Sequence, residues 1–277
     1  LAITFGFWRV INMAHGEFMM IGAYTTYVVQ GLIQKFISKD AADIGYFVSI
    51  IAAFAVTFII GSLLETFVVS RLYGREIDSL LATWGISLIL QQAARSIFGT
   101  QGVLVTTPEI LSGSIKIGGA SFSLTRLFII VLVGISLFMV WVLMYHTNFG
   151  RQMRAVMQNR AMAQCMGINS RKVDNITFSI GSGLAGIAGC SIALLGSIDS
   201  TVGQNYIVNT FMAVVLGGVG KLLGTVLGST IIGFSSIGFE TITSSSIAKA
   251  IVLLIIIIFL QKKPQGLFTV RSRALDE

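Results

Sequence analysis

The chain has 277 residues, of which 54% are hydrophobic and 11% charged, and its mean hydropathy is +0.85. A soluble globular domain carries about 25% charged residues, so this composition excludes that class and predicts an all-α polytopic membrane protein. The net charge of +7 comes from basic residues dispersed between apolar runs, which argues against a nucleic-acid-binding face or tail. The two cysteines, Cys165 and Cys190, lack ligand or disulfide spacing and are interpreted as packing residues.

Apolar runs that approach or reach the length of a transmembrane helix, about 20 residues, recur along the chain. The first run opens the chain, so we expect its helix to be truncated. Runs 206–219 and 247–260 are short enough to be broken, re-entrant or tilted helices. We therefore expect one transmembrane domain, residues 1–277, built as a helical bundle of about 8–9 membrane segments. The predicted segments are 1–11, 18–33, 44–69, 79–98, 125–145, 173–197, 206–219, 222–240 and 247–260.

Small residues recur every four positions in two of these runs. Gly181, Ala185 and Gly189 form one row, with Ser182, Gly186 and Cys190 beside it, and Gly220, Gly224 and Gly228 form another. Such rows let helices approach closely in a membrane, so they predict tight helix crossings, with lining of a transport path as the alternative.

The distribution of Lys and Arg predicts the orientation, because cytoplasmic loops carry more of them. If the C-terminal tail is cytoplasmic, segments 70–78, 146–172 and 261–277 share its side together with Lys221. That side then holds twelve basic residues against six on the other. Residues 99–124, rich in Gly, Ser and Thr, are expected to form an exposed external loop or a small hairpin.

The segment 146–172 predicts an amphipathic cytoplasmic helix over residues 151–166. Asn148 and Gly150 favour a helix entry, Gly167-Ile168-Asn169 favours an end, and nothing before Cys165 is expected to break the helix. The apolar side chains at helical spacing are Met153, Val156, Met157, Ala161 and Met162, while Arg154, Gln158 and Arg160 occupy other angles.

Asn12, His15 and Glu17 form a polar cluster inside otherwise apolar sequence. A charged residue near the centre of a membrane helix costs about 2.5 to 3.5 kcal/mol on insertion scales, so such residues usually face a bundle interior or a water-filled path. The alternative is that His15 and Glu17 pair with each other or cap a helix end at the interface.

No motif in the chain predicts an enzyme, a cofactor or a metal site. Gly218 to Leu222 resembles a phosphate loop but has no Ser or Thr after Lys221. His15-Gly16-Glu17 has no second His four residues on, which excludes a zinc helix motif. No set of nucleophile, base and orienting group recurs.

Three separated motifs resemble the permease subunits of branched-chain amino acid ABC importers, and the resemblance covers essentially the whole chain. Other stretches look most like the urea-importer branch of that family, namely 17–25, 205–208 and 261–268. The family motifs are Asn12-Met13-Ala14-His15-Gly16-Glu17, Arg154-Ala155-x-x-x-Asn159-x-x-x-Ala163-x-x-x-Gly167-Ile168-Asn169 and Val215-Leu216-Gly217-Gly218-Val219-Gly220.

The resemblance implies a multi-pass permease of the bacterial inner membrane. It implies that separate cytoplasmic ATPase subunits hydrolyse ATP, that a second related permease completes the path, and that a periplasmic binding protein delivers the substrate. The helix 151–166 is similar to the family's coupling helix, with the alternative that it rests on the lipid bilayer. The residues implied in coupling are Met153, Arg154, Met157, Asn159, Arg160, Ala163 and Gly167.

The expected activity is alternating-access import of a small polar solute, urea first, with a branched-chain amino acid as the alternative. Urea needs hydrogen-bonding groups, and Asn12, His15, Glu17 and Thr83 are the expected path lining. An amino acid favours a helix N-terminus or a cation near its carboxylate, and nothing in the predicted spans clearly provides either. A non-ABC secondary transporter or channel, and a purely structural membrane subunit, remain alternative classes.

Overall fold

The computed structural model describes residues 1–8, 12–36, 42–117, 120–263 and 266–268. The end of the first predicted run and the C-terminal tail beyond Phe268 lie outside these residues. The helices are α1 (Ala2–Trp8), α2 (His15–Phe36), α3 (Ala42–Phe67), α4 (Glu76–Phe98), α5 (Leu124–His146), α6 (Asn148–Gln158), α7 (Arg160–Cys165), α8 (Ser170–Ala193), α9 (Val202–Gly217), α10 (Leu222–Glu240) and α11 (Ser245–Lys262). The short elements are the 3-10 turns η2 (Val69–Arg71) and η3 (Glu109–Leu111) and the strands β1 (Ser114–Ile117) and β2 (Ala120–Ser123).

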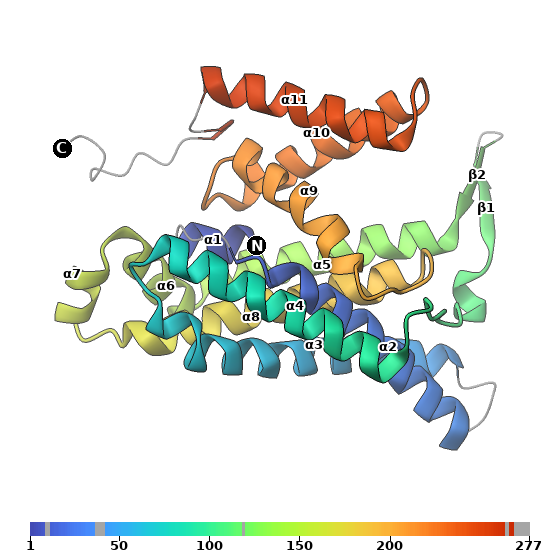
Figure 1. Ribbon diagram of the computed structural model, residues 1–277, viewed down its shortest axis with the longest axis horizontal. Coiled ribbons are helices and arrows are strands. Elements are labelled where there is room, and N and C mark those ends of the chain that lie inside the picture. The colour runs from blue at the N-terminus through green and yellow to red at the C-terminus, as the bar shows by residue number, and fades with distance from the viewer. Residues whose placement is uncertain (9–11, 37–41, 118–119, 264–265, 269–277) are drawn as a thin grey trace.

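The predicted all-α polytopic membrane bundle is confirmed, and every predicted apolar run coincides with a helix (Figure 1). Five helical segments are long and apolar enough, by length and composition, to cross a membrane. The helices of the other four predicted runs are too short or too polar to be counted among these five. Helices α1 and α9 have 7 and 16 residues, while α2 and α4 carry polar side chains. The five segments are Asp43–Arg71, Leu124–His146, Ser170–Ala193, Leu222–Glu240 and Ser245–Lys262.

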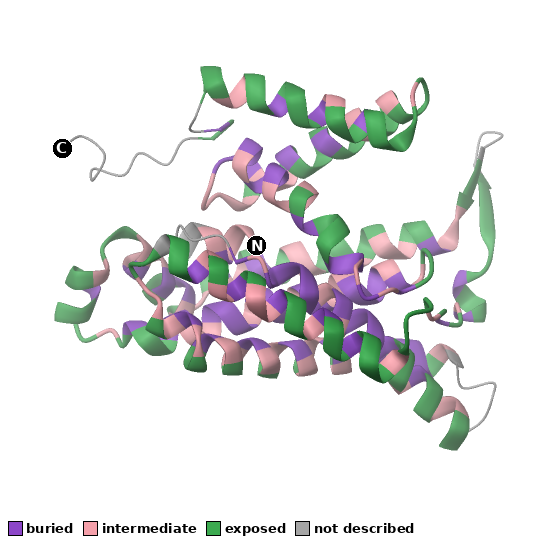
Figure 2. Cartoon of the chain, viewed as in Figure 1, coloured by how far each residue is buried: buried purple, intermediate pink, exposed green. Residues whose placement is uncertain are grey.

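Helix α8 is the most buried of these five segments. In its most apolar stretch 67% of residues are buried, against 11% to 22% in the other four (Figure 2). Helices α2 and α3 approach α8 closely because α8 carries glycines at the contacts. A Cβ on Gly189 would overlap the Met19 carbonyl of α2, and one on Gly186 would overlap Thr57 of α3. The predicted row of small residues on α8 therefore packs helices against each other.

Helices α9, α10 and α11 lie together beside this bundle (Figure 1). Gly217 of α9 and Gly224 of α10 are in backbone contact, so the second row of small residues also forms a crossing. A further crossing joins this group to the bundle: a Cβ on Gly16 of α2 would lie 2.5 Å from the carbonyl oxygen of Gly203 of α9. The described end of the chain is fixed here as well, since the Leu267 amide donates to the Leu216 carbonyl at 2.8 Å.

The predicted single helix over 151–166 is wrong, because the chain forms two helices that meet at Asn159. This residue is extended (φ −153°, ψ 104°), and its Oδ1 accepts a hydrogen bond of 3.0 Å from the Met162 amide. Asparagine caps helix N-termini well, and here that local bond replaces the continuation of α6.

The apolar face of α6 and α7 packs onto the chain's own core. Met153 and Ala163 are 1% and 5% exposed and lie in one cluster with Val140 of α5 and Val173 of α8. The expectation that this face lodges in a partner is therefore corrected for Met153 and Ala163.

The segment 99–124 contains an antiparallel hairpin of β1 and β2, with Ser114 opposite Ser123 and Ile117 opposite Ala120. An isolated bridge between Val103 and Ile198 ties this segment to the chain between α8 and α9. The hairpin lies at the opposite end of the bundle from α6 and α7 (Figure 1).

Candidate functional site

Asn12 lies in the turn that leads into helix α2, and this turn contacts α4. Its Oδ1 accepts a hydrogen bond of 3.0 Å from the Ala14 amide, and the adjacent Met13 amide donates to Thr83 Oγ1 at 3.2 Å. Asn12 Nδ2 is buried and has no hydrogen-bond partner among the described residues. A buried amide group without a partner is costly, so it marks a place where a water or substrate oxygen fits.

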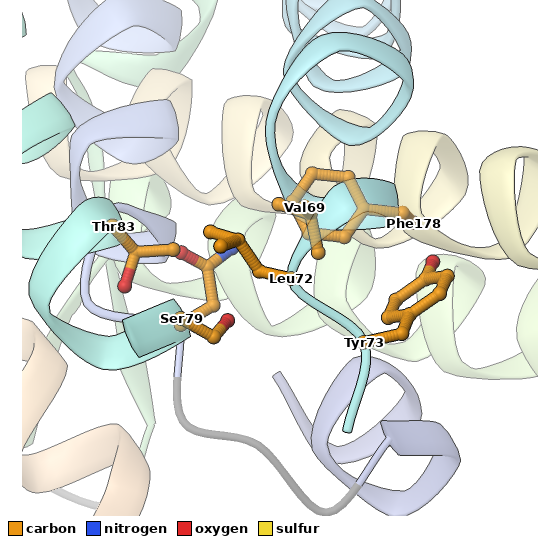
Figure 3. Close-up of a pocket in the computed structure, with 7 residues that line it drawn as sticks. Val69, Leu72, Tyr73, Ser79, Thr83 and Phe178 are labelled. Atoms are coloured by element: carbon orange, nitrogen blue, oxygen red, sulfur yellow. The ribbon is translucent and has the colours of Figure 1, made fainter. Parts of the chain in front are cut away.

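A small pocket opens beside Asn12, lined on α4 by Ser79 and Thr83 (Figure 3). Figure 3 shows Val69, Tyr73 and Phe178 on its other side; Leu72 completes the lining. Its volume of about 10 Å³ is of the size that one water occupies. The structure is therefore closed to a substrate here.

Glu17 faces α4 one turn farther along. Its carboxylate oxygen Oε1 accepts hydrogen bonds from Ser87 Oγ and Gln91 Nε2, each at 2.8 Å, and the residue is 1% exposed. Oε2 is buried and has no partner in the described part of the chain. The alternative that Glu17 pairs with His15 is wrong, because its partners come from a different helix.

His15 lies apart from this cluster. It is buried, packs edge-on against Phe18 with ring centroids 6.0 Å apart, and lies with Thr4 of α1 beside Gly181 of α8. The structure thus brings together Asn12, Glu17 and Thr83 and leaves His15 on the side of α1.

Most of the polar groups that α4 contributes are not among the residues expected from the sequence. Ser79, Thr83, Ser87 and Gln91 recur every four residues and are 2% to 5% exposed, so they form one buried polar stripe along the helix. The four-residue spacing was the available signal. The hydroxyl and amide groups of the stripe can donate and accept hydrogen bonds. No group of three metal-ligating side chains occurs among the described residues.

A second polar network joins α7 to the wall of the pocket. Arg160 of α7 pairs with Asp174 of α8 at 2.5 Å, and its guanidinium lies 4.9 Å from the centre of the Tyr73 ring. Tyr73 donates to Glu65 Oε1 at 2.6 Å, and Asn175 donates to Glu65 Oε2 at 2.8 Å. Burial raises the pKa of the Tyr73 hydroxyl, and its bond to Glu65 raises that pKa further, so the hydroxyl remains a donor.

Curated relatives match most of the chain. The chain is 28% identical to the high-affinity branched-chain amino acid transport system permease protein BraD of Pseudomonas aeruginosa, over 82% of this chain and 75% of that protein. It is 24% identical to the corresponding protein LivH of Escherichia coli, over 96% of this chain and 87% of that protein. A ribose import permease protein, RbsC of Escherichia coli, is 32% identical over 48% of this chain and 44% of its own length.

The comparison with solved structures finds no match. The family described as "Branched-chain amino acid transport system / permease component" matches residues 1–260, which include the Asn12 pocket, the α4 stripe and the segment of α6 and α7. The chain therefore belongs to this family of transport-system permease components.

Proposed function

We propose that the chain is the membrane permease subunit of an ABC importer that moves a branched-chain or similar amino acid into the cytoplasm. The observation that carries this proposal is the family match over residues 1–260, together with relatives named for branched-chain amino acid transport. The relatives' names favour an amino acid over urea. In this proposal a second related permease, cytoplasmic ATPase subunits and a periplasmic binding protein complete the importer.

The proposed path runs between α2 and α4. Asn12 and Thr83 meet at the small pocket, Glu17 binds the α4 stripe farther along, and His15 forms the wall toward α1. Hydrogen-bonding groups in a narrow apolar setting suit a polar solute. Because the pocket holds about one water, passage requires α2 and α4 to separate.

The proposed orientation places α6, α7 and the end of α11 in the cytoplasm of a cell whose inner membrane holds the protein. The excess of Lys and Arg on that side supports it. The β1–β2 hairpin then faces the periplasm, where a binding protein docks.

The proposed contact with the ATPase is the outer surface of α6 and α7. Met162 and Met166 are 63% and 76% exposed beside the α7 C-terminus and Gly167, so they are available to a partner groove. Arg154 donates to the Met144 carbonyl and Arg160 pairs with Asp174, so both anchor the segment to the bundle. Met157, half-buried, and Asn159, which caps α7, hold the two helices in position.

The test is uptake into proteoliposomes that contain the assembled importer, with its binding protein outside and ATP inside. We expect uptake of radiolabelled leucine that depends on ATP. ATP-driven uptake of urea with no uptake of any branched-chain amino acid would overturn the proposed substrate. Uptake that proceeds equally without ATP would favour the secondary transporter or channel.

A further inference from the structure

We propose that Tyr24, Arg95 and Asp199 form a recognition site for the zwitterionic head of an α-amino acid at the end of the bundle opposite α6 and α7. This site deepens the proposed function and rests on it. It is separate from the Asn12 pocket, because Tyr24 lies midway along α2 and Arg95 lies in the last turn of α4, whereas the pocket lies before α2 and at the start of α4. Tyr24, Arg95 and Asp199 come respectively from α2, α4 and the chain that leads into α9.

The cation of the site is Arg95, in the last turn of α4. Its Nε donates a hydrogen bond of 2.8 Å to Ser200 Oγ, which fixes the direction of an otherwise exposed side chain. No carboxylate among the described residues lies within ion-pair distance of its guanidinium. The outer edge of the guanidinium is therefore available, and a guanidinium edge binds a carboxylate with two parallel hydrogen bonds.

The anion of the site is Asp199, the neighbour of Ser200. Its Oδ1 accepts hydrogen bonds of 2.7 Å from both the amide and the hydroxyl of Thr201, so the carboxylate has a fixed position and is partly exposed. This leaves Oδ2 to accept from an ammonium group.

The third member is the hydroxyl of Tyr24. Tyr24 is 4% exposed and stacked on Phe98 with ring centroids 4.2 Å apart, yet its hydroxyl has no hydrogen-bond partner among the described residues. Tyr24 packs in one buried cluster with Ala94 and Ile198, the chain neighbours of Arg95 and Asp199. A buried hydroxyl without a partner is costly unless a ligand or water pairs with it.

Helix α9 adds a fourth favourable feature. It begins at Val202, directly after Thr201, and Thr201 provides no side-chain cap to its first turn. The positive end of a helix of 16 residues therefore lies beside the same guanidinium, and both favour a carboxylate. These groups come from separate parts of the sequence and converge only in the folded chain, which is why the predicted spans show no clear cation or helix N-terminus for an amino acid.

Together these groups match the head of an α-amino acid. Arg95 and the α9 N-terminus suit its carboxylate, Asp199 suits its ammonium, and Tyr24 donates or accepts the remaining hydrogen bond. Urea carries no charge, so it would meet these groups through hydrogen bonds alone, without the ion pairs that a zwitterion forms.

The test measures binding of radiolabelled leucine to the assembled importer in lipid nanodiscs without the binding protein. Leucinamide, which lacks the carboxylate, and 4-methylpentanoate, which lacks the ammonium, serve as competitors. We expect Arg95→Gln and Asp199→Asn each to weaken leucine binding about tenfold or more, and Tyr24→Phe about threefold. Arg95→Gln leaves leucinamide binding unchanged, and Asp199→Asn leaves 4-methylpentanoate binding unchanged.

The matched control is Arg126→Gln, which removes an exposed arginine at the start of α5 at the same end of the bundle. Equal leucine binding by Arg95→Gln and Arg126→Gln, or no leucine binding by the unchanged importer, overturns the site. Uptake with the binding protein present separates the two proposals: normal leucine uptake by the Arg95 and Asp199 variants removes only this site, whereas urea uptake in place of leucine removes the proposed substrate.

Discussion

Arg160 of α7 forms an ion pair of 2.5 Å with Asp174 of α8, and the Asp174 side chain is fully buried while that of Arg160 is 37% exposed. The pair fixes the segment proposed to meet the ATPase onto the most buried helix of the bundle. Because the Arg160 guanidinium also covers the Tyr73 ring, a displacement of α7 acts on the wall of the Asn12 pocket.

Breaking this pair is expected to destabilise the protein and uncouple it. Arg160→Met leaves a buried carboxylate, which costs about 3 kcal/mol, the low end for such pairs because Arg160 is partly exposed. Thermal unfolding of the purified chain in detergent measures the loss. Adding Asp174→Leu should restore most of the stability but not ATP-driven uptake, and full uptake by the double variant would contradict a role in coupling.

An acidic residue on the outer surface of α7 is expected to block association with the ATPase. Met162→Asp and Met166→Asp place a charge at exposed apolar positions, so the chain should fold normally but retain little ATPase on co-purification. Gln101→Asp, at an exposed position of the segment 99–124, outside the proposed docking surface, is the control for the added charge. Undiminished ATPase recovery with both methionine variants would remove the proposed docking surface.

Replacement of Glu17 separates hydrogen bonding from charge. Glu17→Leu leaves Ser87 and Gln91 without their acceptor, so we expect a loss of about 1–3 kcal/mol in unfolding free energy. Glu17→Gln keeps an acceptor oxygen and should retain most of that stability. Glu240→Gln, at an exposed carboxylate, controls for the change in charge, and equal stability of the Leu and Gln variants would show that the network contributes nothing.

A methyl group at Gly189 is expected to force α2 and α8 apart. The added Cβ would overlap the Met19 carbonyl, which cannot shift without moving the helix, so Gly189→Ala should cost about 1–3 kcal/mol. Gly233→Ala on α10 is the control, because no atom lies within 4 Å of its added Cβ. Unfolding midpoints of the two variants in the same detergent provide the measurement.

The positions of the apolar helices follow from hydropathy, so the apolar runs predict every helix except α6 and α7. The break at Asn159 was missed because periodicity does not register a side chain that caps its own backbone. The prediction that Met153 faces a partner was wrong for a related reason. An amphipathic face shows only that something covers it, and here the chain's own core does so.

The residues of the polar site were likewise predictable only in part from the sequence. Glu17 stands out in the sequence because it interrupts an apolar run, and Thr83 lies on a visible four-residue spacing. Hydrogen-bond partners that lie far apart in the sequence cannot be predicted in this way. Ser87 lies 70 residues from Glu17, and Ser200 lies 105 residues from Arg95. Such pairs depend on where helices cross, which single-sequence patterns do not contain.

The glycine contacts of α8 have a mechanical consequence. Backbones that touch without intervening side chains leave no compliant layer, so α2, α3 and α8 are expected to tilt as one block. Helix α4 is held differently, by hydroxyl and amide groups along a single stripe. Hydrogen bonds of that kind exchange readily for bonds to water or solute. We therefore expect the interface between α2 and α4 to open more easily than the glycine contacts of α8.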